Sequence, residues 1–417
     1  MHVLYVHQNY PAQFGHIARE LAGKPDWRCT FVSRTEASGV VNGIDRVPYR
    51  TRGGATAQNH FCSRTFENAV WHCDGVYRAM KARPDVRPDV IVAHSAFGSS
   101  LFLRELYPDV PVVNFFEWFY RPHHSDMDFR RDLPWPIEEE KFLRSHCRNA
   151  MIFLDLNNCR LGYCPTAFQR AGFPELYQPR LRVIFDGVDR LLYHGHNEAL
   201  RPAPGSRGVR KMLGVNVPDS TRVVTYVSRG FESMRGFDVF MRAARIIASR
   251  FSDVVFFVVG SDKVEYGGDL AHTGGKSFKD WVLSRDEYDL SKFVFTGRLE
   301  PQQLARLLAA TDLHIYLTVP FVLSWSMVDA MSCGAVVLGS ATPPVMEMIR
   351  DGENGLLAAF FEPEDFADKA IRILSDPAAH RPLGRAAEQL IDQKYSLEAV
   401  LPQMVKLYAD AAATGAG

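Results

Sequence analysis

The sequence predicts an α/β protein made of two doubly wound, Rossmann-like domains. Its 417 residues exceed the roughly 150 residues of one typical domain. Short apolar runs alternate with longer amphipathic stretches from one end to the other, as in strand–helix–strand units that form parallel sheets. The alternation pauses once, in the polar and Pro/Gly-rich stretch 195–220, and then resumes. These observations together indicate two parallel sheets, each covered by helices on both faces.

The strand candidates are short runs rich in Val, Ile and Phe that lack strict polar alternation, as expected of strands buried on both faces. They are 2–7, 29–33, 44–47, 89–94, 111–116, 150–155, 181–185, 222–228, 254–260, 292–296, 312–317, 335–339 and 355–358. The helix candidates between them are 12–22, 60–82, 97–106, 136–148, 236–250, 301–310, 325–333, 364–375 and 395–411. We therefore expect an N-terminal domain at 1–194 and a C-terminal domain at 195–394. The helix of the final segment 395–417 either caps the second domain or crosses back to the first.

The composition excludes several classes of protein. Lys+Arg and Asp+Glu are both 48, so no global charge attracts nucleic acid or an anionic membrane. No apolar run approaches the roughly 20 residues of a transmembrane helix, and Met1–His7 lacks the pattern of a signal peptide. We therefore expect a cytoplasmic protein without a nucleic-acid partner or a transmembrane segment, in which a local site holds any anionic ligand.

Cysteine and histidine give no metal-binding pattern. The seven cysteines are scattered, and the closest pair, Cys159 and Cys164, has no second pair with nearby histidines to complete a zinc site. His123 and His124 are adjacent, so their side chains point in different directions. We expect buried thiols in a reducing compartment and no metal site.

The segment 226–237 carries the strongest chemical signal. A strand ends at Ser228, a short loop follows, and Arg235-Gly236 opens an amphipathic helix. Arg229 and Arg235 place two guanidiniums at the carboxyl end of a strand and beside a helix N-terminus. Bidentate guanidinium contacts and free helix amides together suit a pyrophosphate. The alternative is a pair of solvated loop arginines.

A second segment, 318–337, has the same strand–loop–helix form. Ser324 is a plausible N-cap, and the amides near Trp325 and Ser326 are candidate phosphate donors. Asp329, one turn into the helix, is a candidate acceptor for a ribose diol, and the alternative is a solvated helical aspartate. The loop 296–299, with Arg298 and Leu299, offers backbone groups to a nucleobase.

With these residues the chain resembles retaining GT-B glycosyltransferases of the family 4 type, which include sucrose synthase-like and bacterial envelope sugar transferases. The resemblance covers nearly the whole chain and is most specific in Arg229–Gly236, Phe321–Gly334, Val183–Asp189 and Gly339–Leu356. It implies an α/β GT-B fold with two Rossmann-like domains facing across a cleft. The nucleotide-diphosphate sugar would bind mainly to the C-terminal domain and the acceptor to the N-terminal domain. The resemblance also implies that the last helix crosses back to the N-terminal domain.

The resemblance assigns roles to particular positions. Arg229 and Arg235 would neutralise the donor pyrophosphate, with arginine replacing the family's lysine at the second position. Asp186–Asp189 matches a domain-junction element and is expected to be structural or hinge-forming. The loop 7–16 resembles the family's Gly-containing loop near the transferring phosphate and sugar, where Gly15 would allow close backbone approach. His94–Ser100 is either a loop on the acceptor side or a simple helix cap.

Two positions depart from the family pattern. The first of its paired glutamates falls on Phe321, which cannot hydrogen-bond a sugar hydroxyl, whereas the second falls on Asp329 and keeps a carboxylate. The family's catalytic-site histidine falls on Glu117, which can accept a hydrogen bond from a sugar hydroxyl or orient the acceptor. The alternative for Glu117 is a structural carboxylate paired with Arg121 or a neighbouring histidine.

We therefore expect a metal-independent glycosyltransferase of the hexosyltransferase class that moves a sugar from a nucleotide-diphosphate donor to an acceptor hydroxyl with retention. We expect no required metal, because Asp126 and Asp128, although spaced like a metal-binding motif, lie far from the donor elements. We also expect no other required cofactor. The acceptor is a small molecule, a glycan or a lipid-linked compound, selected by loops 48–62 and 120–135. The alternatives are a non-catalytic nucleotide-sugar-binding protein and another GT-B enzyme, such as an epimerase or a phosphorylase.

Overall fold

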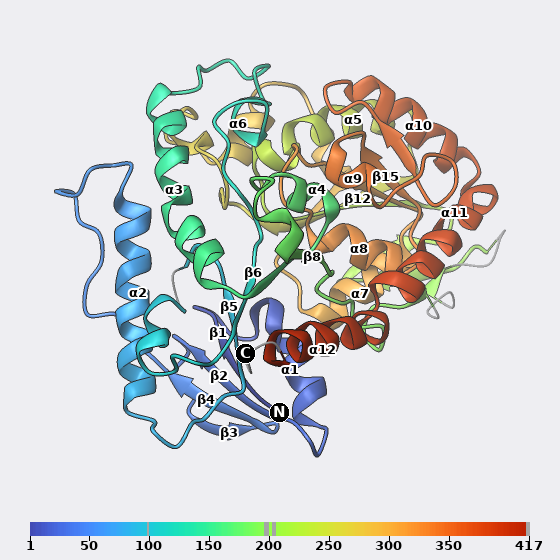
Figure 1. The fold of residues 1–417 in the computed structure, drawn as a ribbon. Helices are drawn as coiled ribbons and strands as arrows, with labels where there is room; N and C mark the ends of the chain where they lie inside the picture. Colours follow the sequence, from blue (N-terminus) through green and yellow to red (C-terminus); the bar gives the residue numbers. More distant parts are fainter. Residues whose placement is uncertain (98–99, 196–199, 202–205, 414–417) are drawn as a thin grey trace. The chain divides into compact units, whose positions relative to one another are not determined.

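The structure is a computed structural model that describes residues 1–97, 100–195, 200–201 and 206–413 (Figure 1). The chain divides into two compact units. The N-terminal unit comprises 1–128, 136–187 and 397–417, and the C-terminal unit comprises 129–135 and 188–396. The chain leaves the N-terminal unit between Gly187 and Val188, within the stretch matched to a domain junction.

The polar stretch 195–220, where no strand was predicted, contains two strands. Strands β9 (Val209–Met212) and β10 (Val215–Pro218) form an antiparallel hairpin that packs on the core of the C-terminal unit. Leu213 and Gly214 both have positive φ, as a two-residue hairpin turn requires. Residues 196–199 and 202–205 of this stretch, residues 98–99 of the loop 94–100, and residues 414–417 lie outside the described residues.

The N-terminal unit is built on a sheet of order β3-β4-β2-β1-β5-β6-β7-β8, parallel except for the β3–β4 pair. Its strands are β1 (His2–Val6), β2 (Arg28–Ser33), β3 (Gly39–Val41), β4 (Ile44–Pro48), β5 (Val90–His94), β6 (Val112–Phe115), β7 (Leu161–Cys164) and β8 (Leu181–Val183). The helical segments are η1 (Ala12–Phe14), α1 (Gly15–Ala22), α2 (Arg64–Lys81), η2 (Leu101–Glu105), η3 (Asp126–Asp128), α3 (Glu139–Asn158), α4 (Ala167–Ala171), η4 (Gln178–Arg180) and α12 (Leu397–Ala413).

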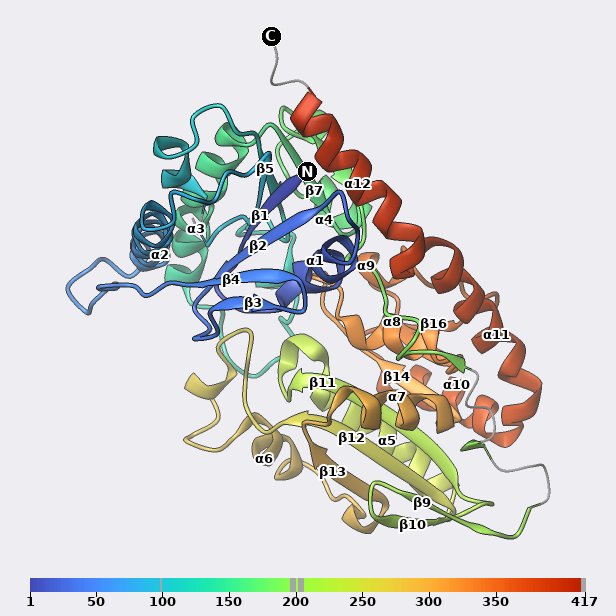
Figure 2. The same cartoon turned by 90° about the horizontal axis from the view of Figure 1, so that it is seen from below.

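Helices cover both faces of this sheet because side chains of each strand point alternately to the two sides. Leu4 and Val6 of β1 join the cluster formed with α2 and α3. Tyr5 points the other way, toward Phe14 beside α1 and Tyr408 of α12, with ring centroids 5.8 and 6.3 Å away. The last helix of the chain, α12, therefore packs into the N-terminal unit (Figure 2).

The predicted strand 150–155 is wrong, because these residues continue the helix α3. Met151, Ile152, Asp155 and Leu156 are buried, whereas the side chain of Phe153 is exposed, which is the spacing of one helix face. A short apolar run cannot be assigned to a strand or a buried helix by its composition alone. The strand at this point of the order is β7, which follows immediately after α3.

The C-terminal unit contains a fully parallel sheet of order β13-β12-β11-β14-β15-β16. Its strands are β11 (Arg222–Gly230), β12 (Val254–Ser261), β13 (Phe293–Gly297), β14 (Leu313–Tyr316), β15 (Val337–Ser340) and β16 (Leu356–Ala358). The helical segments are η6 (Ser233–Arg235), α5 (Phe237–Arg250), η7 (Asp269–Ala271), α6 (Phe278–Leu283), η8 (Leu290–Lys292), α7 (Pro301–Ala310), α8 (Trp325–Ser332), α9 (Pro343–Met346), α10 (Pro363–Ser375), α11 (Pro377–Leu390) and η9 (Ile391–Tyr395). Helices α5 and α10 pack together on one face, and α7 with the hairpin β9–β10 covers the other (Figure 2).

Each sheet has a switch point, where consecutive connections leave in opposite directions. In the N-terminal sheet it lies between β1 and β5, and in the C-terminal sheet between β11 and β14. Ligands of doubly wound folds bind beyond the carboxyl ends of the strands at such points. The predicted class of two parallel-sheet Rossmann-like domains is confirmed, and the two switch points are where functional side chains are to be sought. Within the described chain, no helix combines the length and the apolar character needed to cross a membrane.

Candidate functional site

Arg235 connects the two strands at the switch point of the C-terminal sheet. It lies in the loop after β11 and is 7% exposed. Its Nη1 donates to Thr318 Oγ1 at 2.7 Å and to the Val322 carbonyl at 3.0 Å. Both acceptors lie in the segment that follows β14. Its Nε and Nη2 donate to none of the described residues. A planar guanidinium held by one nitrogen keeps its other N–H groups in a fixed direction, ready for a bidentate anion.

Arg229 lies at the end of β11 and remains largely in solvent. Its side chain is 62% exposed, and its Nε is 3.5 Å from Glu265 Oε2. The next residue in that loop, Tyr266, lies under the guanidinium of Arg235, 5.5 Å from carbon to ring centroid. Arg229 therefore contacts Glu265, and Arg235 contacts its neighbour Tyr266 in the same loop. The two arginines lie at the same end of β11.

Buried acidic groups hold the backbone around the two arginines. The carboxylate of Glu232, which is fully buried, accepts hydrogen bonds from the amides of Glu265 and Tyr266 at 2.7 and 2.8 Å. Burial raises the pKa of Glu232 to about 7. Asp269 accepts from both the amide and the hydroxyl of Ser233 at 2.8 and 2.7 Å. These contacts preorganise the arginine loop, so little reordering is needed when an anion binds.

A segment from the first half of the sequence supports the same loop. Residues 129–135 belong to the C-terminal unit, and Arg130 is 7% exposed. Its guanidinium donates to both carboxylate oxygens of Asp238 at 3.1 and 2.7 Å and to the Ser233 carbonyl at 2.5 Å. It also forms a bidentate pair with Asp132 at 2.9 and 3.0 Å. Sequence reasoning missed these contacts because Ser233 and Asp238 lie more than a hundred positions away from Arg130.

Gly236 turns the chain from the arginine loop into α5. It has φ +61, and a Cβ placed there would lie 2.7 Å from Leu317 Cβ. Glycine suits this position because it lacks a Cβ and readily adopts the left-handed conformation. The residue therefore sets where α5 begins relative to Arg235.

The helix α8 begins as predicted, with Ser324 as its N-cap. The Ser324 hydroxyl accepts from the Ser326 amide at 3.4 Å, and the Ser326 hydroxyl donates to the Val227 carbonyl of β11 at 3.2 Å. The amide of Ser326, one of the two predicted phosphate donors, is therefore already engaged in the cap. Trp325, which carries the other, has a side chain 41% exposed.

Asp329 lies one turn into α8 and is not a solvated helical aspartate. Its surroundings are dense although part of its surface is exposed, and burial raises the pKa of Asp329 to about 8. The carboxyl group makes no ion pair or side-chain hydrogen bond with the described residues. The oxygens of such a carboxyl group can accept hydrogen bonds from hydroxyl groups, and the predicted contact with a ribose stays a prediction.

Phe321 packs around Arg235 where the family pattern has a glutamate. Its ring is 8% exposed and lies 5.4 Å from the ring of Tyr266. The Arg235 guanidinium carbon is 5.9 Å from the Phe321 centroid, so the cation has an aromatic ring on two sides. No described carboxylate lies within salt-bridge distance of the Arg235 guanidinium.

The candidate nucleobase loop follows β13. Gly297 ends the strand with φ +69. The side chain of Arg298 is exposed and makes no ion pair with the described residues, whereas Leu299 packs against the core cluster of the C-terminal unit. Leu299 thus helps to anchor the loop, and the proposed contact of its backbone with a nucleobase stays a prediction.

The N-terminal switch point brings three titratable side chains together. His7 follows β1, His94 ends β5, and Glu117 follows β6. The rings of His7 and His94 are 5.1 Å apart between centroids, and His94 Nε2 is 3.8 Å from Glu117 Oε2. Gln13 Nε2 lies 3.4 Å from the other carboxylate oxygen. Glu117 is therefore associated with a histidine, as one sequence-based alternative held, and its side chain is still 34% exposed.

Gly15 has a structural reason to be glycine. A Cβ at this position would lie 2.2 Å from Pro11 Cβ, inside the loop that precedes α1. The absence of a side chain is therefore required by packing within the loop itself. The proposed close approach of a ligand to Gly15 stays a prediction.

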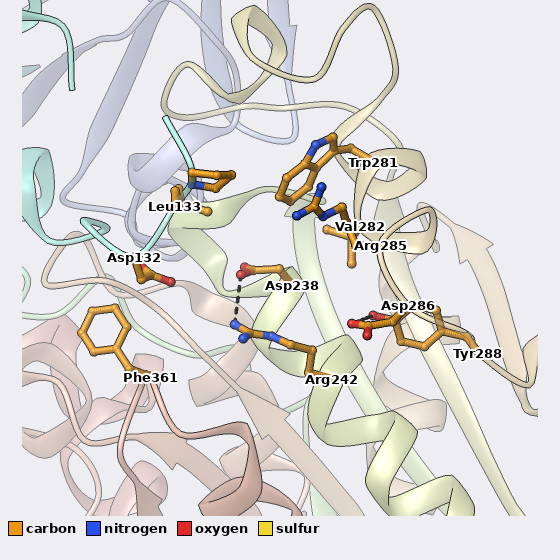
Figure 3. Close-up of a pocket in the computed structure, with 11 residues that line it drawn as sticks. Asp132, Leu133, Asp238, Arg242, Trp281, Val282, Arg285, Asp286, Tyr288 and Phe361 are labelled. Atoms are coloured by element: carbon orange, nitrogen blue, oxygen red, sulfur yellow. Dashed lines mark hydrogen bonds and ion pairs between the residues drawn. The ribbon is translucent and has the colours of Figure 1, made fainter. Parts of the chain in front are cut away.

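A pocket of about 340 Å³ opens beside the first turns of α5 in the C-terminal unit (Figure 3). Aromatic rings and charges of both signs line it: Asp132, Leu133, Pro134, Asp238, Arg242, Trp281, Val282, Arg285, Asp286, Tyr288 and Phe361. The carboxylates are paired with arginines, as in Arg130–Asp238 and Arg245–Asp286. Such a lining offers stacking surfaces and hydrogen-bonding groups without a strong net charge.

Comparison with known proteins gives two family matches. Residues 25–192 match the "Glycosyl transferase family 4 group", and residues 213–390 match the "Glycosyl transferases group 1". N-acetyl-alpha-D-glucosaminyl L-malate synthase of Bacillus anthracis is 25% identical over 238 residues, 57% of this chain and 56% of that protein. D-inositol 3-phosphate glycosyltransferase of Corynebacterium aurimucosum is 28% identical over 233 residues, 55% of this chain and 51% of that protein. The chain thus spans about half the length of these curated relatives.

Solved structures resemble the chain over nearly its full length. Sucrose-phosphate synthase from Thermosynechococcus elongatus superposes with a TM-score of 0.71 at 17% identity and covers 99% of this chain and 100% of its own. Anabaena HepE, solved in complex with UDP-glucose, gives a TM-score of 0.69 at 16% identity over 98% of this chain and 100% of its own. At such identities these structures bear on the fold. Together with the two family matches, they show that the chain belongs to the GT-B glycosyltransferases of the family 4, group 1 type.

Proposed function

We propose that this protein transfers a sugar from a nucleotide-diphosphate donor to an acceptor hydroxyl with retention of the anomeric configuration. The observation that carries the proposal is the guanidinium of Arg235, which bridges the loops after β11 and β14 and keeps Nε and Nη2 open beside the exposed Arg229. A departing nucleoside diphosphate gains negative charge, and preorganised cationic donors at that place lower the barrier.

The donor is proposed to lie along the carboxyl ends of β11, β13 and β14. Asp329 accepts hydrogen bonds from the ribose hydroxyls, and the backbone near Arg298 meets the nucleobase. Trp325 and the start of α8 lie toward the phosphates. HepE was solved with UDP-glucose, so UDP-sugars are the first donors to test. No metal ion enters the proposal, because the two arginines supply the positive charge that a metal would otherwise provide.

The resemblance implies an acceptor site on the N-terminal domain, whereas the pocket beside α5 belongs to the C-terminal unit. We propose that a polar acceptor binds in this pocket. Leu133 and Pro134 of the 120–135 loop, which we expect to select the acceptor, form one wall of this pocket. Trp281 and Tyr288 offer aromatic surfaces, and Arg285 makes no ion pair with the described residues. A glycan or another polyhydroxylated acceptor fits this combination, because such molecules stack on aromatic rings and hydrogen-bond to charged groups.

Donor hydrolysis with a panel of UDP-, ADP- and GDP-sugars tests the proposal, with and without EDTA. We expect release of nucleoside diphosphate from at least one donor, unaffected by EDTA, and NMR of the released sugar at early times should show the donor's anomer. Tight nucleotide binding without turnover of any donor would indicate a binding protein. Conversion of the donor sugar without an acceptor would indicate an epimerase, and consumption of phosphate would indicate a phosphorylase.

A further inference from the structure

Residues 129–135, named the strap, are fixed to the C-terminal unit near both ends. The ring of Phe129 stacks on Phe361 with centroids 4.9 Å apart and an interplanar angle of 28°. The ring of Trp135 stacks on His272 with centroids 5.2 Å apart and an interplanar angle of 9°. Aromatic pairs of this kind stabilise a contact beyond the area that they bury. The two stacks therefore hold the strap on the C-terminal unit.

The middle of the strap forms one wall of the pocket beside α5. Asp132, Leu133 and Pro134 line this pocket, together with Asp238 of α5 (Figure 3). A carboxylate has about four lone-pair sites, so an oxygen that accepts a bond from an arginine can also accept one from a hydroxyl group. The carboxylates of Asp132 and Asp238 are therefore suited to a polyhydroxylated ligand. A ligand that contacts the strap in this way stabilises its docked position.

The guanidinium of Arg130 joins the pocket to the arginine loop. It donates to both carboxylate oxygens of Asp132 and to both of Asp238. Its Nη1 also donates to the carbonyl of Ser233, which opens the 3₁₀ turn that ends at Arg235. All three nitrogens of the guanidinium are thus engaged, and its planar fork holds these acceptors in one fixed arrangement.

One rigid guanidinium therefore orders the strap and the arginine loop together. A ligand that stabilises either of them favours the order of both. We propose that Arg130 is a positioning residue that couples the pocket beside α5 to the pyrophosphate site, so that an acceptor and a nucleoside diphosphate each strengthen the binding of the other. The docked strap with an ordered arginine loop is the state that binds both. This coupling rests on the proposed function, which places the acceptor in the pocket and the donor at the arginine loop.

Lysine in place of Arg130 isolates this role. Lysine keeps the positive charge but carries it as a point charge on a flexible stem, so it cannot make parallel contacts to two carboxylates and a carbonyl. Asp269 would still hold the amide and the hydroxyl of Ser233. Arg242 would still lie 3.4 Å from Asp238. Arg130→Lys should therefore break the link while each end keeps another support.

Calorimetry with UDP measures the coupling at the donor end. Arg130→Lys should weaken UDP binding at least about fivefold, a typical coupling between two sites, although Arg130 is not among the residues proposed to contact the donor. Arg222→Lys is the matched control. Arg222 also donates to a carboxylate, that of Asp253, and to a backbone carbonyl, that of Leu374, but at the amino end of β11. The control should bind UDP like the wild type, and a folded Arg130→Lys protein that does the same would overturn the proposal.

A double-mutant cycle tests whether the effect passes through Arg130. Trp135→Ala removes the stack at the far end of the strap and should weaken UDP binding at least about threefold in the wild type, but not further in Arg130→Lys, where the link is already broken. Trp71→Ala, which removes a partly buried tryptophan of α2, is the control and should leave UDP binding unchanged. Equal effects of Trp135→Ala in the two backgrounds, or none in either, would overturn the proposal. If Arg130→Lys does not fold, Asp132→Asn takes its place, because it weakens the same link at its more exposed carboxylate.

The link can also be measured without a nucleotide. Three amides at the end of the arginine loop are hydrogen-bonded within it, those of Arg235, Gly236 and Phe237. Their hydrogen exchange in the full chain should be at least about threefold faster in Arg130→Lys and unchanged in Arg222→Lys. If the wild type binds none of UDP, ADP and GDP, the proposed function fails, and this exchange still decides whether Arg130 orders the loop. Equal exchange in the wild type and Arg130→Lys would overturn the proposal.

Discussion

Arg229 offers the sharpest test of the donor site, because its removal should lower activity strongly while leaving the fold intact. Arg229→Ala should lower kcat/KM for donor hydrolysis by about two to three orders of magnitude, as expected for loss of one cationic donor to the departing phosphate. The same change should alter the free energy of unfolding by less than about 1 kcal/mol. The effect on catalysis should be large and the effect on stability small. Arg229 makes one exposed ion pair within the protein, whereas it is proposed to contact the pyrophosphate of the donor.

The magnitudes follow from the surroundings of the side chain. Its ion pair with Glu265 is 3.5 Å long and the Arg229 side chain is 62% exposed, so the pair stabilises the fold by about 0–1 kcal/mol. A unit charge about 4 Å from a phosphate charge near the protein surface contributes about 4 kcal/mol at an effective dielectric constant of about 20. Each 1.4 kcal/mol is about a tenfold change in rate, so the upper bound is about a thousandfold.

Steady-state release of nucleoside diphosphate measures the effect, and urea unfolding measures stability. Arg350→Ala is the matched control, because Arg350 forms a similarly exposed pair with Glu353 at 3.6 Å and precedes β16 at its amino end. The control should retain both activity and stability. Activity of Arg229→Ala within fivefold of wild type, or a loss equal to that of the control, would refute the assignment of Arg229 to the pyrophosphate.

Three further outcomes are expected. Burial raises the pKa of Asp329 to about 8, so its acid form prevails at pH 7. Ribose hydroxyls bind best to the ionised carboxylate. Calorimetry should therefore show the affinity for UDP rising from pH 7 to pH 9 in the wild type and not in Asp329→Asn. Gly236→Ala should lower the free energy of unfolding by at least about 1 kcal/mol more than Gly274→Ala. Both glycines have φ near +60, but only at position 236 would an added Cβ lie against another residue. Equal decreases in the free energy of unfolding, measured by urea unfolding, would contradict this. Trp281→Ala should raise the KM for the acceptor without changing donor hydrolysis, and an unchanged acceptor KM would remove the pocket from the acceptor site.

Much of the C-terminal site follows from local sequence. The run of β-branched and aromatic residues in β11, the two arginines after it and the left-handed Gly236 before α5 form one continuous stretch. The Ser324 cap and the position of Asp329 in α8 are likewise local. A parallel strand delivers the residues after it to the carboxyl edge of its sheet, so these side chains could be placed there before any coordinates were known.

The support of that site does not follow from local sequence. Arg130 comes from the first half of the chain and holds Asp238 and the Ser233 carbonyl of the arginine loop. Glu232 and Asp269 hold the same loop through backbone amides. Nothing in the neighbouring residues of Arg130 marks it as a partner of α5. Contacts of this kind depend on which surfaces the packed sheet brings together.

The two parallel sheets, the positions of most of their strands and the residues at their carboxyl ends follow from the amino-acid sequence, because hydrophobic periodicity and turn residues act over a few positions. The helical state of 150–155, the position of Glu117 beside His94 and the raised pKa of Asp329 became known from the packed structure. Burial and proton affinity depend on neighbours distant in the chain, so they exist only once the chain has packed.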